Sequence, residues 1–123
     1  MMFENVEEIV NLTPHVINVW MGSEVRIIPT SGNVARIRIR SENFGTVMGV
    51  PVVLSTDGSV VGLPPPTRGV VFLVSSVVAK SVKRPDVLSP DTTDDGVIRD
   101  GATGMITAVK RLQCFCPDQE IIW

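Results

Sequence analysis

The segment from Gly69 to Pro90 constrains the fold more than any other part of the sequence. It begins with a run of apolar residues, 70–74, which follows a Pro/Gly turn and predicts a strand that is buried on both faces. From Val74 onward the apolar residues recur at helical spacing instead. We therefore expect a buried strand that leads directly into one short helix formed by Ser75 to Arg84.

Single residues indicate where this helix begins and ends. Ser75 or Ser76 can cap its start, because a serine hydroxyl accepts a hydrogen bond from a backbone amide of the first turn. Pro85 disfavours helical backbone at Arg84, so the helix should end there. The valines of the segment lower its helix propensity through their branched side chains, and a continued strand is the alternative structure.

The composition excludes several classes of protein. The chain has 123 residues, 44% of them hydrophobic, which is enough to bury the core of one domain, residues 1–123, without disulfides. Its 11 basic and 13 acidic residues give a net charge of −2, so it has no general attraction for nucleic acid. No apolar run approaches the roughly 20 residues that cross a bilayer. We expect neither nucleic acid nor a membrane as a partner.

The charged residues at the N-terminus and the two cysteines indicate the cellular compartment in which the protein is found. Residues 1–10 are an acidic lead-in where a secretory signal would be basic, so we expect a cytoplasmic protein. Cys114 and Cys116 should be reduced thiols in that compartment. Because His15 is the single histidine, the usual ligands of a structural metal are scarce, and we expect neither a metal nor a cofactor.

The acidic lead-in fits either a short helix or a strand. After it, the sequence shows strand patterns separated by turns. Residues 16–20 and 25–28 predict a hairpin. Residues 33–40 alternate between apolar residues and arginines, which predicts a strand with one core face and one row of positive charge. That row is either a solvated face balanced by carboxylates or a surface that contacts phosphates.

The middle of the chain predicts two more reversals. Residues 44–55 should form a hairpin around Gly49, and the dipeptide Asp57-Gly58 is a strong signal for a second tight turn. The three prolines at 64–66 predict a stiff linker that crosses to the central strand.

Beyond the helix, residues 86–104 are rich in Asp, Thr and Gly and predict an exposed binding or mobile loop. Residues 104–112 supply a last strand. The C-terminal tail, 113–123, is apolar enough that we expect it to dock on the domain or to form a contact in a homo-oligomer.

Together these patterns predict an α+β fold. We expect a mainly antiparallel, barrel-like or strongly bent β-sheet of about six to eight strands, with one short helix. Prolines close to several strand positions argue against a flat sandwich.

Polar residues from several segments are candidates for a ligand site. Arginine presents a planar fork that suits phosphates and carboxylates, and the start of a helix presents backbone amides to an anion. The structural alternatives are a histidine that bonds a backbone carbonyl and an arginine that stabilises a helix C-terminus. The candidate ligand-binding residues are Thr13, His15, Arg36, Ser75, Ser76, Arg84, Asp86 and Arg99.

An ordered set of short motifs resembles a family of small, largely uncharacterised proteins of bacteriophages and bacteria that open on N-L-T-P-H. The resemblance covers about residues 10–112, and the acidic lead-in and the tail depart from it. The motifs are N-L-T-P-H at 11–15, P-T-S-G-N-V-A-R at 29–36, G-V-P-V at 49–52, G-L-P at 62–64, V-S-S-V-V-A-K-S-V-K-R-P-D-V-L-S-P-D-T at 74–92 and R-D-G at 99–101.

The resemblance implies no established reaction. By analogy of class, it is similar to small phage anti-defence proteins that act on nucleotide immune signals of the host. The leading functional hypothesis is a binding protein that sequesters a small anionic, phosphate-bearing nucleotide. One alternative is a metal-independent hydrolase of such a nucleotide with His15 as the acid or base, and another is a phage structural or interaction protein with no small ligand. Whether the protein is an enzyme is left open by the sequence.

Overall fold

The computed structural model describes residues 3 and 5–116 of the chain. This part of the chain forms ten strands, one α-helix and one short 3-10 helix. The elements are β1 (Glu8–Asn11), β2 (Ile17–Trp20), β3 (Val25–Ile28), β4 (Arg36–Val47), β5 (Val50–Val61), β6 (Val70–Leu73), α1 (Ser76–Val82), β7 (Val87–Pro90), η1 (Asp94–Gly96), β8 (Val97–Arg99), β9 (Ile106–Val109) and β10 (Leu112–Cys114).

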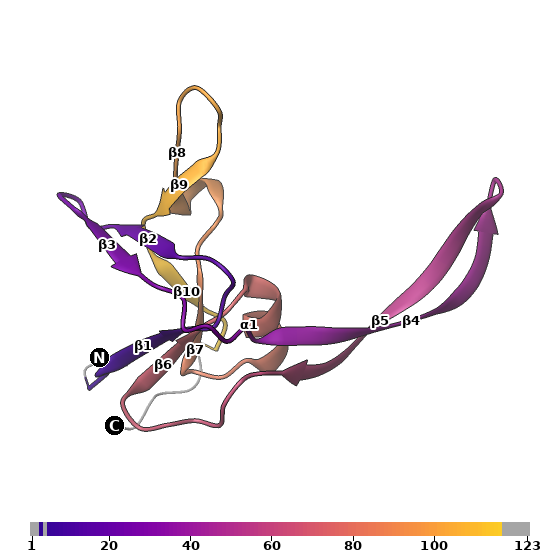
Figure 1. Cartoon of the computed structure of the whole chain (residues 1–123), viewed down its shortest axis with the longest axis horizontal. Coiled ribbons are helices and arrows are strands. Elements are labelled where there is room, and N and C mark those ends of the chain that lie inside the picture. The colour runs from indigo at the N-terminus through magenta and orange to yellow at the C-terminus, as the bar shows by residue number, and fades with distance from the viewer. Residues whose placement is uncertain (1–2, 4, 117–123) are drawn as a thin grey trace.

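The strands form three separate sheets (Figure 1). The first has the order β1-β6-β7-β10, in which β6 runs parallel to both of its neighbours and β10 is antiparallel to β7. The second has the order β3-β2-β9-β8, in which β2 and β9 are parallel and the other pairs antiparallel. The third contains only β4 and β5. The prediction of a β-rich α+β fold with one α-helix is confirmed. The expected mainly antiparallel, barrel-like or strongly bent sheet of about six to eight strands is imprecise, because the described residues form ten strands in three sheets, two of which are mixed, and no closed barrel.

The central strand and helix form where the apolar run predicts them. Strand β6 lies between β1 and β7, and its residues alternate between two cores. Phe72 packs with the helix side, whereas Val71 and Leu73 pack between the sheets. This is the two-sided burial that a continuous apolar run predicts.

Helix α1 is slightly shorter than predicted. Ser75 caps its start, where its side chain accepts a hydrogen bond from the backbone amide of Val78 over 3.4 Å. The helix ends at Val82 instead of Arg84, because Lys83 adopts a left-handed conformation and closes the last turn by donating its amide to the carbonyl of Ala79.

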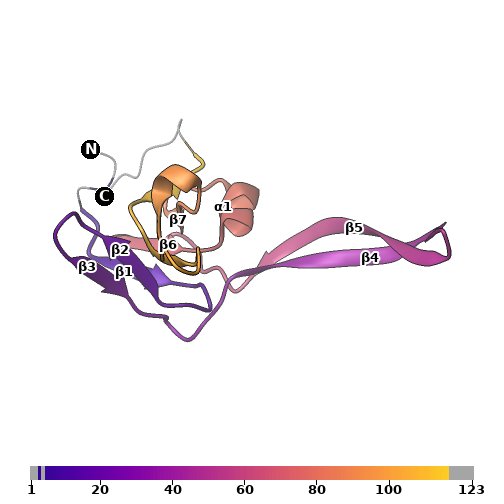
Figure 2. The same ribbon diagram turned by 90° about the horizontal axis from the view of Figure 1, so that it is seen from above.

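Strands β4 and β5 form a long hairpin that projects from the rest of the molecule (Figures 1 and 2). We call residues 36–61 the arm. A hairpin around Gly49 is confirmed: the chain reverses at Met48 and Gly49, whose φ angles of 49° and 80° are those of a tight two-residue turn. The second turn predicted at Asp57-Gly58 is wrong. These residues lie inside β5 at a bulge, where a side chain on residue 58 would collide with the carbonyl of Arg38.

The prediction of one long exposed loop over residues 86–104 is also wrong. Strands β7 and β8 and the 3-10 helix lie within this range, and Asp86 and Asp91 are buried in it. Val87 and Leu88 pair with β6, so their apolar side chains enter both cores. Hydrogen bonding to the neighbouring strands β6 and β10 therefore makes residues 87–90 a strand, although their surrounding composition is typical of a loop.

The remaining segments settle the alternatives that the sequence left open. The end of the lead-in is the strand β1. The expected hairpin of β2 and β3 and the strand expected within residues 104–112, which is β9, are confirmed, although β10 follows as a further strand. The predicted tail begins with β10 and Cys116 is buried, but its remainder, 117–123, lies outside the described residues. Among the described residues, no helix has the length and apolar character needed to cross a membrane.

Candidate functional site

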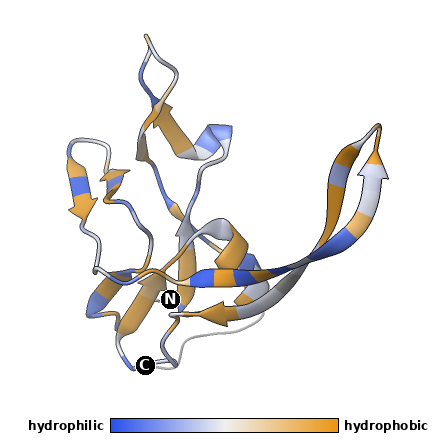
Figure 3. Cartoon of the chain, turned by 45° about the vertical axis from the view of Figure 1, so that its right-hand side comes forward, coloured by the Kyte–Doolittle hydropathy of each residue, from blue (hydrophilic) through white to orange (hydrophobic). Residues whose placement is uncertain are grey.

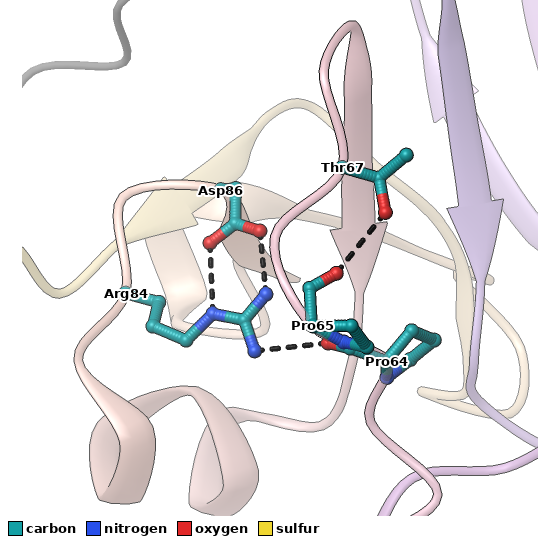
Figure 4. Close-up of polar contacts among 5 residues, drawn as sticks. All are labelled: Pro64, Pro65, Thr67, Arg84 and Asp86. Carbon is teal, nitrogen blue, oxygen red and sulfur yellow. Dashed lines mark hydrogen bonds and ion pairs between the residues drawn. The ribbon is translucent and has the colours of Figure 1, made fainter.

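Arg84 and Asp86, two of the predicted ligand-binding residues, form a partly buried ion pair at the end of α1 (Figure 4). Arg84 Nε and Nη2 donate to the two carboxylate oxygens of Asp86 over 3.0 and 2.6 Å. Its Nη1 donates to the carbonyl of Pro64 over 3.0 Å. The side chains are 23% and 4% exposed, respectively. Asp86 thus orients the Arg84 guanidinium, and the pair fastens the proline linker to the core.

The N-L-T-P-H motif forms a hydrogen-bonded turn between β1 and β2. Asn11 is 1% exposed, and its Nδ2 donates to the carbonyls of His15 and Ile28 over 2.9 and 3.2 Å. Its Oδ1 accepts from the backbone amide of Thr13, and the Thr13 hydroxyl lies 2.7 Å from the same oxygen. Thr13 therefore faces the interior, while His15 is exposed. The motif holds the strand ends together.

Arg36 and Ser75 are brought together in one groove between the base of the arm and α1. The groove has a volume of about 340 Å³, and apolar side chains such as Ile37 and Val77 line most of it. Ser75 caps the helix, so its hydroxyl oxygen already accepts one hydrogen bond, and Ser76 follows as the first helical residue. Of the predicted site residues, only Arg36 and Ser75 line this groove.

Arg99 lies in another part of the molecule, at the end of β8. Its Nη1 donates to the carbonyl of Gly104 over 2.8 Å, and its Nη2 lies 3.7 Å from the exposed carboxylate of Asp94. The predicted site residues are therefore divided among the turn after β1, the groove, the Arg84–Asp86 pair and the β8–β9 hairpin. The described structure does not assemble them into one pocket.

A second carboxylate, Asp91, is buried after β7 and serves the fold. Its side chain accepts hydrogen bonds from the hydroxyl of Thr93 over 2.6 Å and from Nε of Arg111 over 2.6 Å. The Thr93 hydroxyl, followed by the Arg111 guanidinium, lowers the pKa of Asp91 to about 2. Asp91 is thus ionised at neutral pH and joins the segment before β8 to the start of β10.

The cysteines do not form a disulfide. Cys114 is exposed, whereas Cys116 is buried and its Sγ donates to the carbonyl of Lys83 over 2.8 Å. In residues 3 and 5–116, no three His, Cys, Asp or Glu side chains gather as possible metal ligands.

The arm presents a cluster of exposed apolar side chains that the fold does not explain. We call residues 44–54 the arm tip; it contains Phe44, which is 68% exposed, and Met48, which is 98% exposed. Figure 3 shows much hydrophobic colour at the tip, whereas hydrophilic and hydrophobic colours alternate on the arm nearer the body. The other exposed large apolar residues of the tip are Val47, Val50, Val53 and Leu54.

The base of the arm carries positive charge. Arg36, Arg38 and Arg40 alternate along β4 and are all exposed, so the predicted row of positive charge is present. We call these three residues the arginine row. Sequence reasoning found the row but missed the tip. The available signal was that apolar residues between 44 and 54 do not alternate with polar ones, which is not the pattern of a strand with one solvated face.

The arm is poorly covered by the rest of the described chain. It is a two-stranded sheet, so the outer edge of each strand is left without a neighbouring strand. Isolated two-stranded hairpins are marginally stable in water, and contiguous exposed apolar residues mark interaction surfaces. The arrangement suits binding to another surface better than chemistry on a substrate.

Comparison of the chain with models of protein families, with curated proteins and with solved structures gave no match.

Proposed function

We propose that this protein is an interaction or assembly protein that binds another protein chain through its arm. One observation carries the proposal: a projecting two-stranded hairpin presents a cluster of large apolar side chains to water at its tip. This corresponds to the structural or interaction protein among the alternatives that the sequence left open.

The energetics favour a bound tip. Complete burial of a side chain such as Phe or Met stabilises a contact by roughly 1.5–3 kcal/mol, and Phe44 and Met48 are largely unburied. The open strand edges can add main-chain hydrogen bonds to an extended partner segment, as in β-strand addition. Binding costs conformational entropy because side chains and backbone of the arm become ordered at the interface. Burial of the apolar tip must therefore supply much of the binding free energy.

A photo-crosslinking amino acid at position 44 tests this proposal. On irradiation of cells that produce the full chain, we expect an adduct with one further protein chain, identified by mass spectrometry. Met48→Asn should weaken the adduct, since Asn tolerates the left-handed turn position but removes the apolar side chain. The same probe at Met105, which is also 68% exposed, is the matched control. Equal labelling at both positions would contradict the proposal.

Sequestration of a small anionic nucleotide is a second candidate, favoured by the groove that holds Arg36 beside Ser75. Those two are the only polar residues among its described lining, so the groove favours binding over hydrolysis. The proposed relation to phage anti-defence proteins depends on this candidate. Native mass spectrometry with a panel of nucleotides tests it, because a bound intact nucleotide that Arg36→Ala abolishes would support this candidate, and the absence of any bound mass would refute it.

A further inference from the structure

We infer that the chain bound by the arm is a second copy of this protein, and that the arm of one copy binds a groove on the body of the next. The inference rests on the proposed function and names the partner. The acceptor, which we call the body groove, has a volume of about 350 Å³. It lies between the two four-stranded sheets and is lined by residues of β1, β3, β6, β7 and β10.

The body groove complements the apolar part of the arm. Its lining includes the apolar side chains of Val6, Ile9, Val71, Leu88 and Leu112. A groove with this lining offers a surface on which an apolar hairpin tip can be removed from water. The apolar lining of the groove thus matches the apolar side chains of the tip.

The charges along the two surfaces also correspond. The exposed carboxylates of Glu7 and Glu8 line the groove, and the arginine row offers cations on the arm. Arg40 and Phe44 are four residues apart, about 13 Å along a strand, so the arm presents its charges and its apolar tip in sequence along one element. Among the described residues that line the groove, Arg26 is the one cation. Glu42, the acidic residue that follows the arginine row on β4, is its complement on the arm.

The position of the arm argues against a contact with the groove of the same copy. Figures 1 and 2 show the arm leaving the body on the side opposite β1 and β3, whose residues line the body groove. The arm therefore points away from its own groove. A head-to-tail contact of this kind generates a ring or a filament. A symmetric contact between the arginine-bearing faces of two arms would instead place like charges together.

Charge reversal tests this pairing in the full chain. Arg38→Glu with Arg40→Glu reverses the arm, and Glu7→Lys with Glu8→Lys reverses the groove; all four positions are exposed. By sedimentation velocity at low salt, we expect the parent to self-associate and each reversed protein to do so at least about tenfold more weakly. The chain that carries all four changes should recover most of the parent's association.

A matched control separates specific pairing from net charge. Arg99→Glu with Lys110→Glu makes the same charge change as the arm reversal at exposed positions outside the arm, and it should leave association unchanged. Melting temperatures of every variant close to that of the parent would show that the folds are intact.

The outcomes distinguish this inference from the proposed function. Failure of the four-fold variant to recover, or groove reversal without effect, would overturn the body groove as the acceptor while leaving the arm as the binding element. A monomeric parent whose position-44 probe captures a different protein would overturn the second copy but uphold the proposed function. If the position-44 probe captures no chain, the proposed function itself fails.

Discussion

Replacement of Arg84 by lysine probes the pair that fastens the proline linker. Lysine keeps the positive charge but has one nitrogen, so it cannot reproduce the two parallel bonds to Asp86 together with the bond to the Pro64 carbonyl. The carboxylate of Asp86 is 4% exposed and has little access to water as a replacement partner. The variant should therefore lose stability instead of retaining it as a surface Arg→Lys change would.

The size of the loss follows from the contacts. Hydrogen bonds to charged groups contribute about 1.5–3 kcal/mol each, and lysine should lose one or two of the three. Water can solvate the partly exposed side chain at position 84 and so recovers part of the lost hydrogen-bond free energy. We therefore expect a net destabilisation of about 2–3 kcal/mol. For a chain of this length that corresponds to a fall in Tm of roughly 6–12 °C.

Urea denaturation followed by circular dichroism measures this difference directly. Arg68→Lys, at an exposed arginine, is the matched control and should change the free energy of unfolding by less than about 0.5 kcal/mol. A double-mutant cycle with Asp86→Asn should give a coupling energy of about 1 kcal/mol or more, since the two side chains share the bonds. If Arg84→Lys melts within about 2 °C of the parent, the pair does not hold the linker and the reasoning fails.

Two further predictions concern buried polar side chains. Because hydrogen bonds lower the pKa of Asp91 from 3.8 to about 2, its contribution to stability is complete above about pH 4 and is lost as the pH falls toward 2. Asp91→Asn should flatten the dependence of Tm on pH in that range, and an unchanged acid slope would refute the assignment. Asn11→Ala leaves the carbonyls of His15 and Ile28 without its side-chain donor and should reduce the free energy of unfolding by about 1–3 kcal/mol in urea titrations. A smaller change than about 0.5 kcal/mol would show that water replaces the side chain.

Local sequence signals predicted the elements whose structure depends on neighbouring residues. Residues 70–73 of the apolar run formed the central strand, and Ser75 capped the helix that follows it. Met48 and Gly49 reversed the chain in the expected hairpin. In each case the capping hydroxyl, the backbone angle or the side-chain period acts over a few residues, so the tertiary environment had little to add.

Long-range pairing decided the features that the sequence left ambiguous or misrepresented. Asp57-Gly58 has the composition of a turn, yet β4 lies beside it and continues the ladder through a bulge. Residues 86–104 have the composition of a loop, yet parallel pairing with β6 makes part of them a buried strand. The energy of a ladder depends on which strand lies alongside, and no local pattern contains that information.

The candidate site followed the same division. The sequence determined which side chains could bind an anion and that arginines would form a row on β4. Tertiary structure decided that Arg84 is committed to Asp86 and the Pro64 carbonyl, that Thr13 faces the interior and that Arg99 lies on a separate hairpin. It also decided that the apolar residues 44–54 leave the body on the arm, because burial depends on which surfaces the folded chain brings together and not on hydrophobicity alone.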